Sequence, residues 1–307
     1  MALQSWRTMS PRDRREARDG YIGILPWLIG FVLFTAGPLL VSLYLSFTQW
    51  DIIRPPQWVG LNNYVRMFTD DQLFRTSLGV TFSYVLMSVP LQLIVGLALA
   101  LLLNAQVRGM NVFRTIFYLP AVLSGVAVAL MWIWILHPDL GVANGLLGLV
   151  GIQGPGWFWD KSWALPSVVL MRLWGVGGGA VVYLAGLQNI PPQLYEAAQI
   201  DGASRRQQFW RITLPLLTPT LFFQLIIILI DAFRVFTEAF VITKGGPLNA
   251  TYFYMLYLYD EAFQNFNMGY ASALGWVLTI ITAGAAFILF RTSNRWVYYE
   301  DTEERGA

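Results

Sequence analysis

Long apolar stretches constrain this chain more than any other feature of its sequence. A helix that crosses a membrane needs roughly 20 mostly apolar residues, whereas the strands of membrane barrels run to about 9–11 residues and alternate in polarity. Six stretches are long enough for such helices: Tyr21–Phe47, Leu78–Leu103, Val112–Leu136, Ala164–Leu187, Thr220–Thr243 and Tyr270–Phe290. The sequence therefore predicts an all-α membrane protein with six transmembrane helices.

The composition excludes several other classes of protein. Only 12% of the residues are charged, against about 25% in a soluble domain, and 56% are hydrophobic. The absence of cysteine excludes thiolate zinc sites and cysteine nucleophiles. A single histidine, His137, argues against a metal site and a Ser-His-Asp enzyme, and is expected to be a surface residue at the outer interface. The net charge of +2 gives no indication of a nucleic-acid partner.

The distribution of Lys and Arg predicts the orientation. Thirteen lie in the two tails and in or beside the connections after the second and fourth stretches, and five lie in or beside the remaining connections. Because basic residues favour the cytoplasmic side, both termini are expected there, in a bacterial or archaeal cell membrane. The expected organisation is a tail at 1–20, a first helix and external loop at 21–77, a core at 78–290 with a cytoplasmic loop at 188–219, and a tail at 291–307.

The external connection between His137 and Trp163 is rich in Gly and Trp. Tryptophans at this place are typical of an interfacial belt or of a short amphipathic segment that lies on the membrane. Contacts with membrane lipid are therefore expected here, and also at the basic N-terminal tail.

The cytoplasmic loop at 188–219 carries the most informative pattern. Pro191-Pro192 can start a short helix, and Gly202 suits a sharp turn because glycine tolerates positive φ. A second short helix is expected at about Ser204–Ile212, ending before Pro215. One stripe of the first helix, at i, i+3, i+4 and i+7, holds Leu194, Ala197, Ala198 and Asp201. The small residues allow close approach of another surface, so the loop is either a docking element or an amphipathic segment on the headgroups.

The same loop resembles a known family. Its run of Glu196, Ala197, Ala198, Asp201, Gly202 and Ala203, followed by Ile212-x-Leu214-Pro215, is similar to the EAA loop of permease subunits of binding-protein-dependent ABC importers. Other segments resemble the sugar-uptake branch, which includes the maltose and glycerol-phosphate permeases: Val59–Tyr64, Phe113–Pro120, Thr243–Pro247 and Gly269–Ala273. The resemblance extends from about residue 20 to about residue 295.

This resemblance implies the type I permease fold of ABC importers and a function as one half of the translocation path of an ATP-driven sugar importer. It implies three protein partners: a second permease subunit, a cytoplasmic ATPase dimer that contacts the loop at Glu196–Ala203, and an external sugar-binding protein. It also implies no cofactor in this chain, since the ATPase binds ATP and magnesium. The sequence has no Gly-x-x-x-x-Gly-Lys-Ser/Thr motif, which argues against an ATPase site or another enzyme activity in this chain.

Charged residues inside the apolar stretches are costly and need partners or water. Arg172 lies in the fourth stretch, and the fifth contains three more charges at i, i+3 and i+7, expected on one helical face: Asp231, Arg234 and Glu238. A helix rises 1.5 Å per residue, so Arg172 and Arg234 are expected at a similar depth below the outer surface of the membrane. These charges, with Trp174 as a stacking surface, either line a translocation path for sugar or form ion pairs that fix helix packing. The glycines after Trp174 favour a bend in the fourth helix.

Two other functions are compatible with the apolar stretches. An ion-coupled secondary transporter or channel would use Asp231, Arg234 and Glu238 as a relay. An intramembrane glycosyl- or lipid-transferase would need an acidic or metal cluster near the membrane surface, and the sequence offers only scattered carboxylates.

Overall fold

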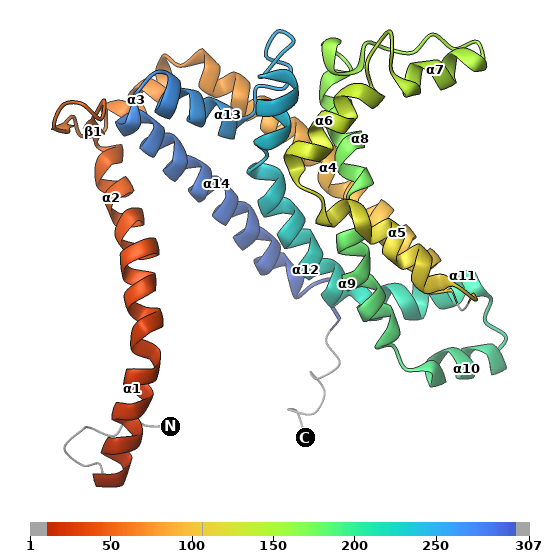
Figure 1. The fold of residues 1–307 in the computed structure, drawn as a ribbon. Coiled ribbons are helices and arrows are strands. Elements are labelled where there is room, and N and C mark those ends of the chain that lie inside the picture. Colours follow the sequence, from red (N-terminus) through yellow and green to blue (C-terminus); the bar gives the residue numbers. More distant parts are fainter. Residues whose placement is uncertain (1–10, 106, 299–307) are drawn as a thin grey trace. The chain divides into compact units, whose positions relative to one another are not determined.

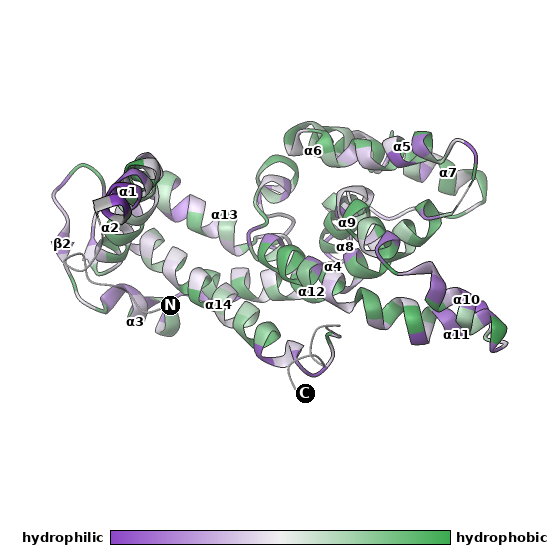
Figure 2. Ribbon diagram, turned by 90° about the horizontal axis from the view of Figure 1, so that it is seen from below, coloured by the Kyte–Doolittle hydropathy of each residue, from purple (hydrophilic) through white to green (hydrophobic). Residues whose placement is uncertain are grey.

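The computed structural model describes residues 11–105 and 107–298, which are mainly helical (Figure 1). A small hairpin pairs β1 (Thr48–Gln49) with β2 (Gln57–Trp58) in antiparallel fashion, and places Thr48 opposite Trp58. Hydrophobic residues cover most of the long helices, as Figure 2 shows. This distribution is expected of helices that face lipid.

The described helices are, in chain order, α1 (Pro11–Phe31), α2 (Gly37–Ser46), α3 (Asn62–Thr69), α4 (Gln72–Leu103), α5 (Met110–Val122), α6 (Gly125–Ile135), α7 (Val142–Leu149), α8 (Ala164–Trp174), α9 (Gly177–Gln188), α10 (Pro192–Ile200), α11 (Arg205–Gln208), α12 (Leu214–Phe233), α13 (Tyr254–Tyr259) and α14 (Met268–Ser293). Short π-helical stretches occupy Val32–Ala36, Phe209–Thr213, Ala239–Thr243 and Asp260–Gln264, and a 3₁₀ turn occupies Trp157–Trp159.

Among the described residues, four continuous helices are long and apolar enough to cross a membrane: Arg14–Ser46, Gln72–Leu103, Arg205–Phe233 and Met268–Ser293. Two bent pairs complete the set, α5 with α6 at 100° and α8 with α9 at 49°. If each pair is one crossing, the chain has the six predicted spans. The bend between α8 and α9 falls at Gly175 and Val176, where the glycine-rich sequence predicts it.

The structure corrects two predicted boundaries. The helix expected to end before Pro215 instead continues from Arg205 to Phe233 through the π-helical stretch. Pro215 is tolerated because it stands near the start of α12, directly after that stretch. The fifth span was predicted to reach Thr243, but α12 ends at Phe233, and a break precedes the helical turn that begins at Thr237.

The chain divides into two compact units. The first comprises residues 1–65 and 261–276, and the second comprises residues 66–260 and 277–307. In the first unit, the Asn63 side-chain amide donates to the carbonyl oxygens of Ser46 and Thr48 at 2.8 and 2.9 Å. The Tyr64 hydroxyl also donates to Ser46 Oγ at 2.8 Å. These bonds hold the start of α3 against the end of α2.

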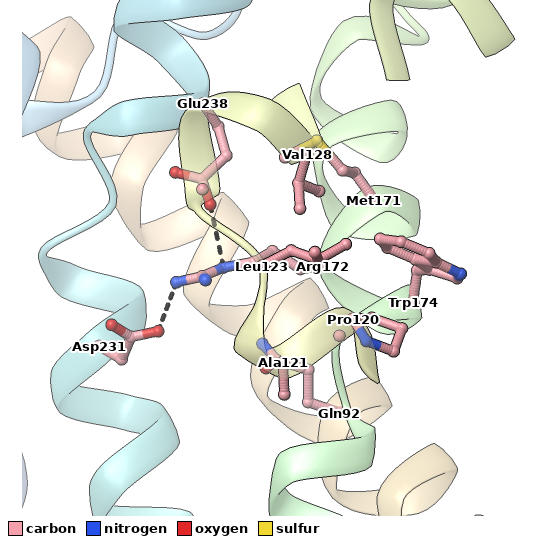
Figure 3. A pocket seen from close by; sticks show the side chains of 12 residues that line it. Gln92, Pro120, Ala121, Leu123, Val128, Met171, Arg172, Trp174, Asp231 and Glu238 are labelled. Atoms are coloured by element: carbon pink, nitrogen blue, oxygen red, sulfur yellow. Dashed lines mark hydrogen bonds and ion pairs between the residues drawn. The ribbon is translucent and has the colours of Figure 1, made fainter. Parts of the chain in front are cut away.

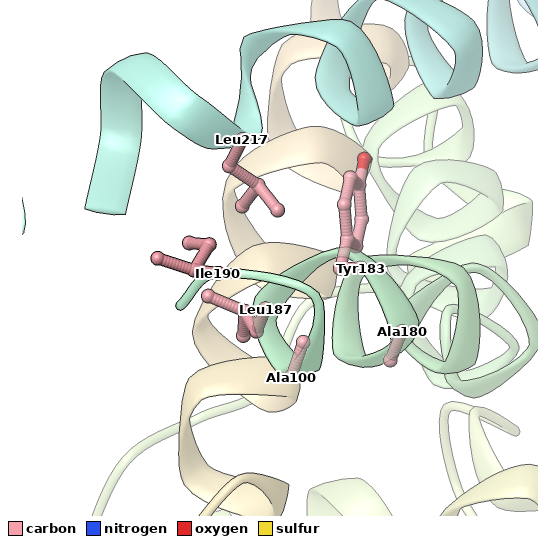
Figure 4. Packing of buried hydrophobic residues seen from close by; sticks show 6 residues of the cluster. All are labelled: Ala100, Ala180, Tyr183, Leu187, Ile190 and Leu217. Atoms are coloured by element: carbon pink, nitrogen blue, oxygen red, sulfur yellow. The ribbon is translucent and has the colours of Figure 1, made fainter. Parts of the chain in front are cut away.

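The second unit is built around α4, which packs against α8, α9, α12 and α13. Asp71 caps this helix by accepting a hydrogen bond from the Phe74 backbone at 2.8 Å. A cluster of buried residues joins α4, α9 and α12 (Figure 4): Ala100, Ala180, Tyr183, Leu187, Ile190 and Leu217. Gly186 of α9 lies so close to α12 that a Cβ atom there would be 2.6 Å from Thr220 Oγ1. Close helix approach therefore depends on a residue without a side chain.

Candidate functional site

The first candidate surface is α10 with the turn that follows it. Pro192 opens the helix, as predicted, and Asp201 ends it. Gly202 has a φ of +79°, which confirms the predicted glycine turn. Ser204 and Gln207 then form a capping box that starts the next helix. The sequence therefore folds locally into two helices separated by a sharp turn.

None of the α10 residues is buried. Glu196, Ala197, Asp201 and Gly202 are exposed, while Ala198 and Ala203 are half-buried. Among the large apolar side chains, Ile200 is 87% exposed and Trp210 is 58% exposed. A short helix with small residues and exposed apolar side chains presents a surface suited to a protein partner.

Tyr195 joins α10 to the membrane-spanning helices. Its hydroxyl forms a 2.9 Å hydrogen bond with Thr213 Oγ1, at the point where the π-helical stretch leads into α12. Its side chain also packs against the buried cluster that joins α4, α9 and α12. Sequence reasoning missed Tyr195, because one aromatic residue in a short helix is not a distinctive sequence pattern, and its contact with Thr213 appears only in the structure.

The second candidate site is a cavity of about 350 Å³ inside the second unit (Figure 3). The bend between α8 and α9 opens one side, and the break between α5 and α6 forms another. Polar and aromatic residues that line it are Gln92, Arg172, Trp174, Asp231 and Glu238. Four of the five predicted translocation-path residues therefore share one cavity.

Arg172 bridges two acidic residues. Its Nη2 donates to the carboxylate of Asp231, and its Nε lies 3.2 Å from Glu238 Oε1. The second contact is an ion pair without hydrogen-bond geometry, since Nε has no hydrogen-bond partner in the described part of the chain. The side chain of Glu238 is 10% exposed, whereas that of Asp231 is 62% exposed. The two acids outnumber the one base, so these three side chains carry a net negative charge.

Arg234 does not join these residues. The prediction of one helical face for Asp231, Arg234 and Glu238 is wrong, because α12 ends between the first two. The Arg234 side chain is exposed and makes no ion pair with the described residues. The neighbouring Phe233 and Val235 are each only 2% exposed. Burial of both neighbours turns Arg234 outward, away from the arrangement that helical spacing predicts.

A polar row on α4 leads to the cavity and was also missed. Tyr84, Ser88 and Gln92 are spaced by four residues, so they lie on one helical face. Gln92 donates to Ser88 Oγ at 2.7 Å, and the buried Tyr84 lies one turn away on the same face. The four-residue spacing of polar residues within an apolar stretch is the signal that sequence reasoning overlooked.

His137 is half-buried at the end of α6. Its Nδ1 accepts hydrogen bonds from the backbone of Asp139 and Leu140, each at 3.2 Å, and its ring lies 5.4 Å from that of Trp159. These contacts give it a structural role in the connection to α7.

Comparison with known proteins identifies relatives along nearly the whole chain. The probable ABC transporter permease protein YesP of Bacillus subtilis (strain 168) is 48% identical over 295 residues, which cover 95% of each chain. The trehalose/maltose transport system permease protein MalF of Thermococcus litoralis is 36% identical over 272 residues, covering 87% of this chain and 90% of the relative.

A solved structure agrees with these sequence relatives. The crystal structure of a bacterial alginate ABC transporter, in complex with an alginate pentasaccharide-bound periplasmic protein, contains a similar chain. The TM-score is 0.82 at 27% identity, and the match covers 92% of this chain and 96% of the other. The fold is thus the type I permease fold of ABC importers that the resemblance implies. Residues 92–297 match the family model described as "Binding-protein-dependent transport system inner membrane component". This multi-pass membrane protein therefore belongs to the family of inner membrane components of binding-protein-dependent transport systems.

Proposed function

We propose that this chain is a permease subunit of an ATP-driven sugar importer and forms half of its translocation path. The relatives support sugar as the substrate class, because one is named for trehalose and maltose and a similar structure belongs to an alginate transporter. The cavity residues suit such a cargo. Carboxylates and the Gln92 amide can hydrogen-bond hydroxyl groups, and an aromatic ring such as that of Trp174, which is 38% exposed, can pack on a sugar face.

The proposed assembly contains a second permease subunit, a cytoplasmic ATPase dimer and an external sugar-binding protein. ATP and magnesium belong to the ATPase, so this chain has no catalytic role of its own. Both termini and α10 lie on the cytoplasmic side, in agreement with the distribution of basic residues. The similar chain in the alginate transporter, which is bound to a periplasmic protein, supports the external partner.

The exposed α10 surface is the observation that carries this proposal. The surface around Glu196–Ala203 receives the motion of the ATPase, and Tyr195 transmits it through Thr213 to α12. Because the helix from Arg205 to Phe233 is continuous, a displacement at its start reaches Asp231 near its end. Asp231 contacts Arg172 of α8, so the same displacement changes the cavity. Coupling and translocation are thus connected by one helix.

An ion-coupled transporter is less well supported. That function requires Asp231, Arg234 and Glu238 to act in sequence, and Arg234 lies apart from the other two. Among the described residues, the remaining ion pairs join Arg172 to two carboxylates, and no further ion pair extends them.

A cross-linking experiment tests the proposed docking. The natural sequence has no cysteine, so Ala197→Cys introduces a single reactive thiol on the exposed face of α10. We expect a reagent that reacts with a thiol at one end and with an amine at the other to join this residue to the co-expressed ATPase in membranes, whereas Asp70→Cys should not cross-link to it. Absence of ATPase cross-links from α10 in transport-active membranes would contradict the proposal.

Loop variants test whether docking drives uptake. Gly202→Pro and Glu196→Lys should abolish sugar uptake while the chain remains folded and inserted. Gly60→Pro is a matched control, because Gly60 also has a positive φ, of +60°, and, like Gly202, has open space around it. Normal uptake in both loop variants would contradict coupling through this loop.

A further inference from the structure

The connection between α6 and α8 exposes an apolar helix face that the proposed transport function does not use. Residues 140–156 contain no charged side chain. Within and around α7, six large aliphatic side chains are more than half exposed: Leu140, Val142, Leu146, Leu149, Val150 and Ile152. Leu149 is the most exposed of these, at 82%. A segment bathed in water on all sides would not normally present so continuous an apolar surface.

The exposed residues of α7 form one stripe. Val142, Leu146 and Leu149 are spaced at i, i+4 and i+7, and Val150 extends the stripe, so their side chains leave the same side of the helix. Asn144 lies on the opposite side. The outward face is therefore the apolar one and the inward face carries the polar residue, which inverts the usual arrangement of a surface helix.

Asn144 fixes this inverted orientation. Its amide nitrogen donates to the carbonyl oxygens of Pro138 at 2.8 Å and of Pro155 at 3.1 Å. Its amide oxygen accepts a 2.6 Å hydrogen bond from the indole of Trp157. Gly154 lies so close that a Cβ atom would be 1.9 Å from this amide oxygen. The stripe thus points outward because three hydrogen bonds hold the other face inward.

The surroundings of the stripe favour lipid as its occupant. The segment joins the end of α6 to the start of α8. Its two ends therefore lie where these membrane-spanning helices leave the bilayer. Figure 1 places α7 at the end of the second unit opposite α10. Trp159 and Trp163, each nearly half exposed, flank the exposed Lys161. Tryptophan and lysine together are typical of the headgroup region of a bilayer.

We propose that the stripe formed by Val142, Leu146, Leu149 and Val150 inserts into the bilayer surface on the side opposite α10. The aliphatic side chains enter the boundary between headgroups and acyl chains, while Trp159 and Lys161 lie at headgroup level. This contact holds the α6–α8 connection on the membrane and fixes the position of the cavity wall formed by the two helices.

Fluorescence in lipid nanodiscs tests this assignment on the complete transporter. Leu149→Cys is labelled with an environment-sensitive fluorophore, with partner subunits in cysteine-free form. Asp70→Cys, at an exposed polar position in another connection on the same side, is the control. Because Leu149 is 82% exposed, its replacement leaves the packing of the chain intact.

The label at Leu149 should emit at shorter wavelength than the label at Asp70. Lipids with a spin label near the top of the acyl chain should quench it at least about two-fold, since such helices insert about 5–10 Å into the interface. Water-like emission without quenching would overturn the proposal. Shifted emission that spin-labelled lipid does not quench would also overturn it, because a protein partner would then cover the stripe.

Discussion

The ion pairs of Arg172 allow a quantitative prediction. In Arg172→Gln, the guanidinium that faces both Asp231 and Glu238 is replaced by a neutral amide. The side chain of Asp231 is 62% exposed, so water replaces the lost ion pair, and this change costs about 0–1 kcal/mol of stability. Glu238, at 10% exposure, becomes an uncompensated buried charge. Its cost should approach the roughly 2.5–3.5 kcal/mol that insertion scales assign to a charge inside a membrane. We therefore expect a loss of about 3 kcal/mol in the free energy of unfolding.

A double-mutant comparison assigns this loss to one partner. Arg172→Gln combined with Glu238→Gln removes the uncompensated charge and should restore the free energy of unfolding to within about 1 kcal/mol of the natural chain. Arg172→Gln combined with Asp231→Asn should recover less than about 1 kcal/mol. Equilibrium unfolding in mixed micelles, followed by tryptophan fluorescence, measures all four chains. Arg295→Gln, at an exposed position, serves as the control for loss of a single charge.

Equal rescue of Arg172→Gln by Asp231→Asn and by Glu238→Gln would contradict this prediction. Burial would then not determine which pair matters. A loss below about 1 kcal/mol for Arg172→Gln itself would mean that water screens both acids.

Three single contacts can be tested by substitution. Tyr195→Phe removes the hydrogen bond to Thr213, which is worth about 0.5–1.5 kcal/mol. The substitution should lower the stimulation of ATP hydrolysis by binding protein about two- to tenfold without changing the cross-linking of α10 to the ATPase. Unchanged stimulation would exclude this bond from coupling. Gly186→Ala should lower the free energy of unfolding by about 1–3 kcal/mol, because its Cβ would clash with α12. Gly284 has open space around it, so Gly284→Ala should be neutral or stabilising in the same unfolding assay. Equal effects of the two substitutions would contradict the close packing of α9 on α12. Trp174→Ala should raise the sugar concentration at half-maximal uptake about tenfold, which corresponds to a contribution of about 1.4 kcal/mol from the ring to binding. An unchanged half-maximal concentration would show that Trp174 does not contact the sugar.

The sequence predicted the features that depend on local patterns. The lengths of the apolar stretches predicted the positions of the membrane-spanning helices, and the glycines after Trp174 indicated the bend between α8 and α9. Gly202 was recognised as a turn because positive φ favours glycine at that place. The cavity was partly predicted, since a charge in an apolar stretch needs a partner, and Arg172 has Asp231 and Glu238.

The features that were missed depend on contacts between distant residues. The local pattern does not place the end of α12 at Phe233, because the apolar stretch continues beyond it and is interrupted only by a few charged or polar residues, among them Asp231 and Arg234. The break coincides with packing of Phe236 against Tyr259 of α13, with ring centroids 5.2 Å apart. Such tertiary contacts override helical propensity. The inward orientation of Asn144 and the hydrogen bond of Tyr195 likewise become visible only when the connections fold back on the helices.

The central claim is that this chain transports sugar by coupling to a separate ATPase through α10. The most direct measurement is ATP hydrolysis by the complex that co-purifies with the chain, reconstituted in lipid, with and without sugar-loaded binding protein. We predict that an ATPase and a second permease co-purify, that the loaded binding protein stimulates hydrolysis, and that Glu196→Lys abolishes the stimulation. A chain that purifies alone and carries solute into liposomes with only an ion gradient would contradict the account.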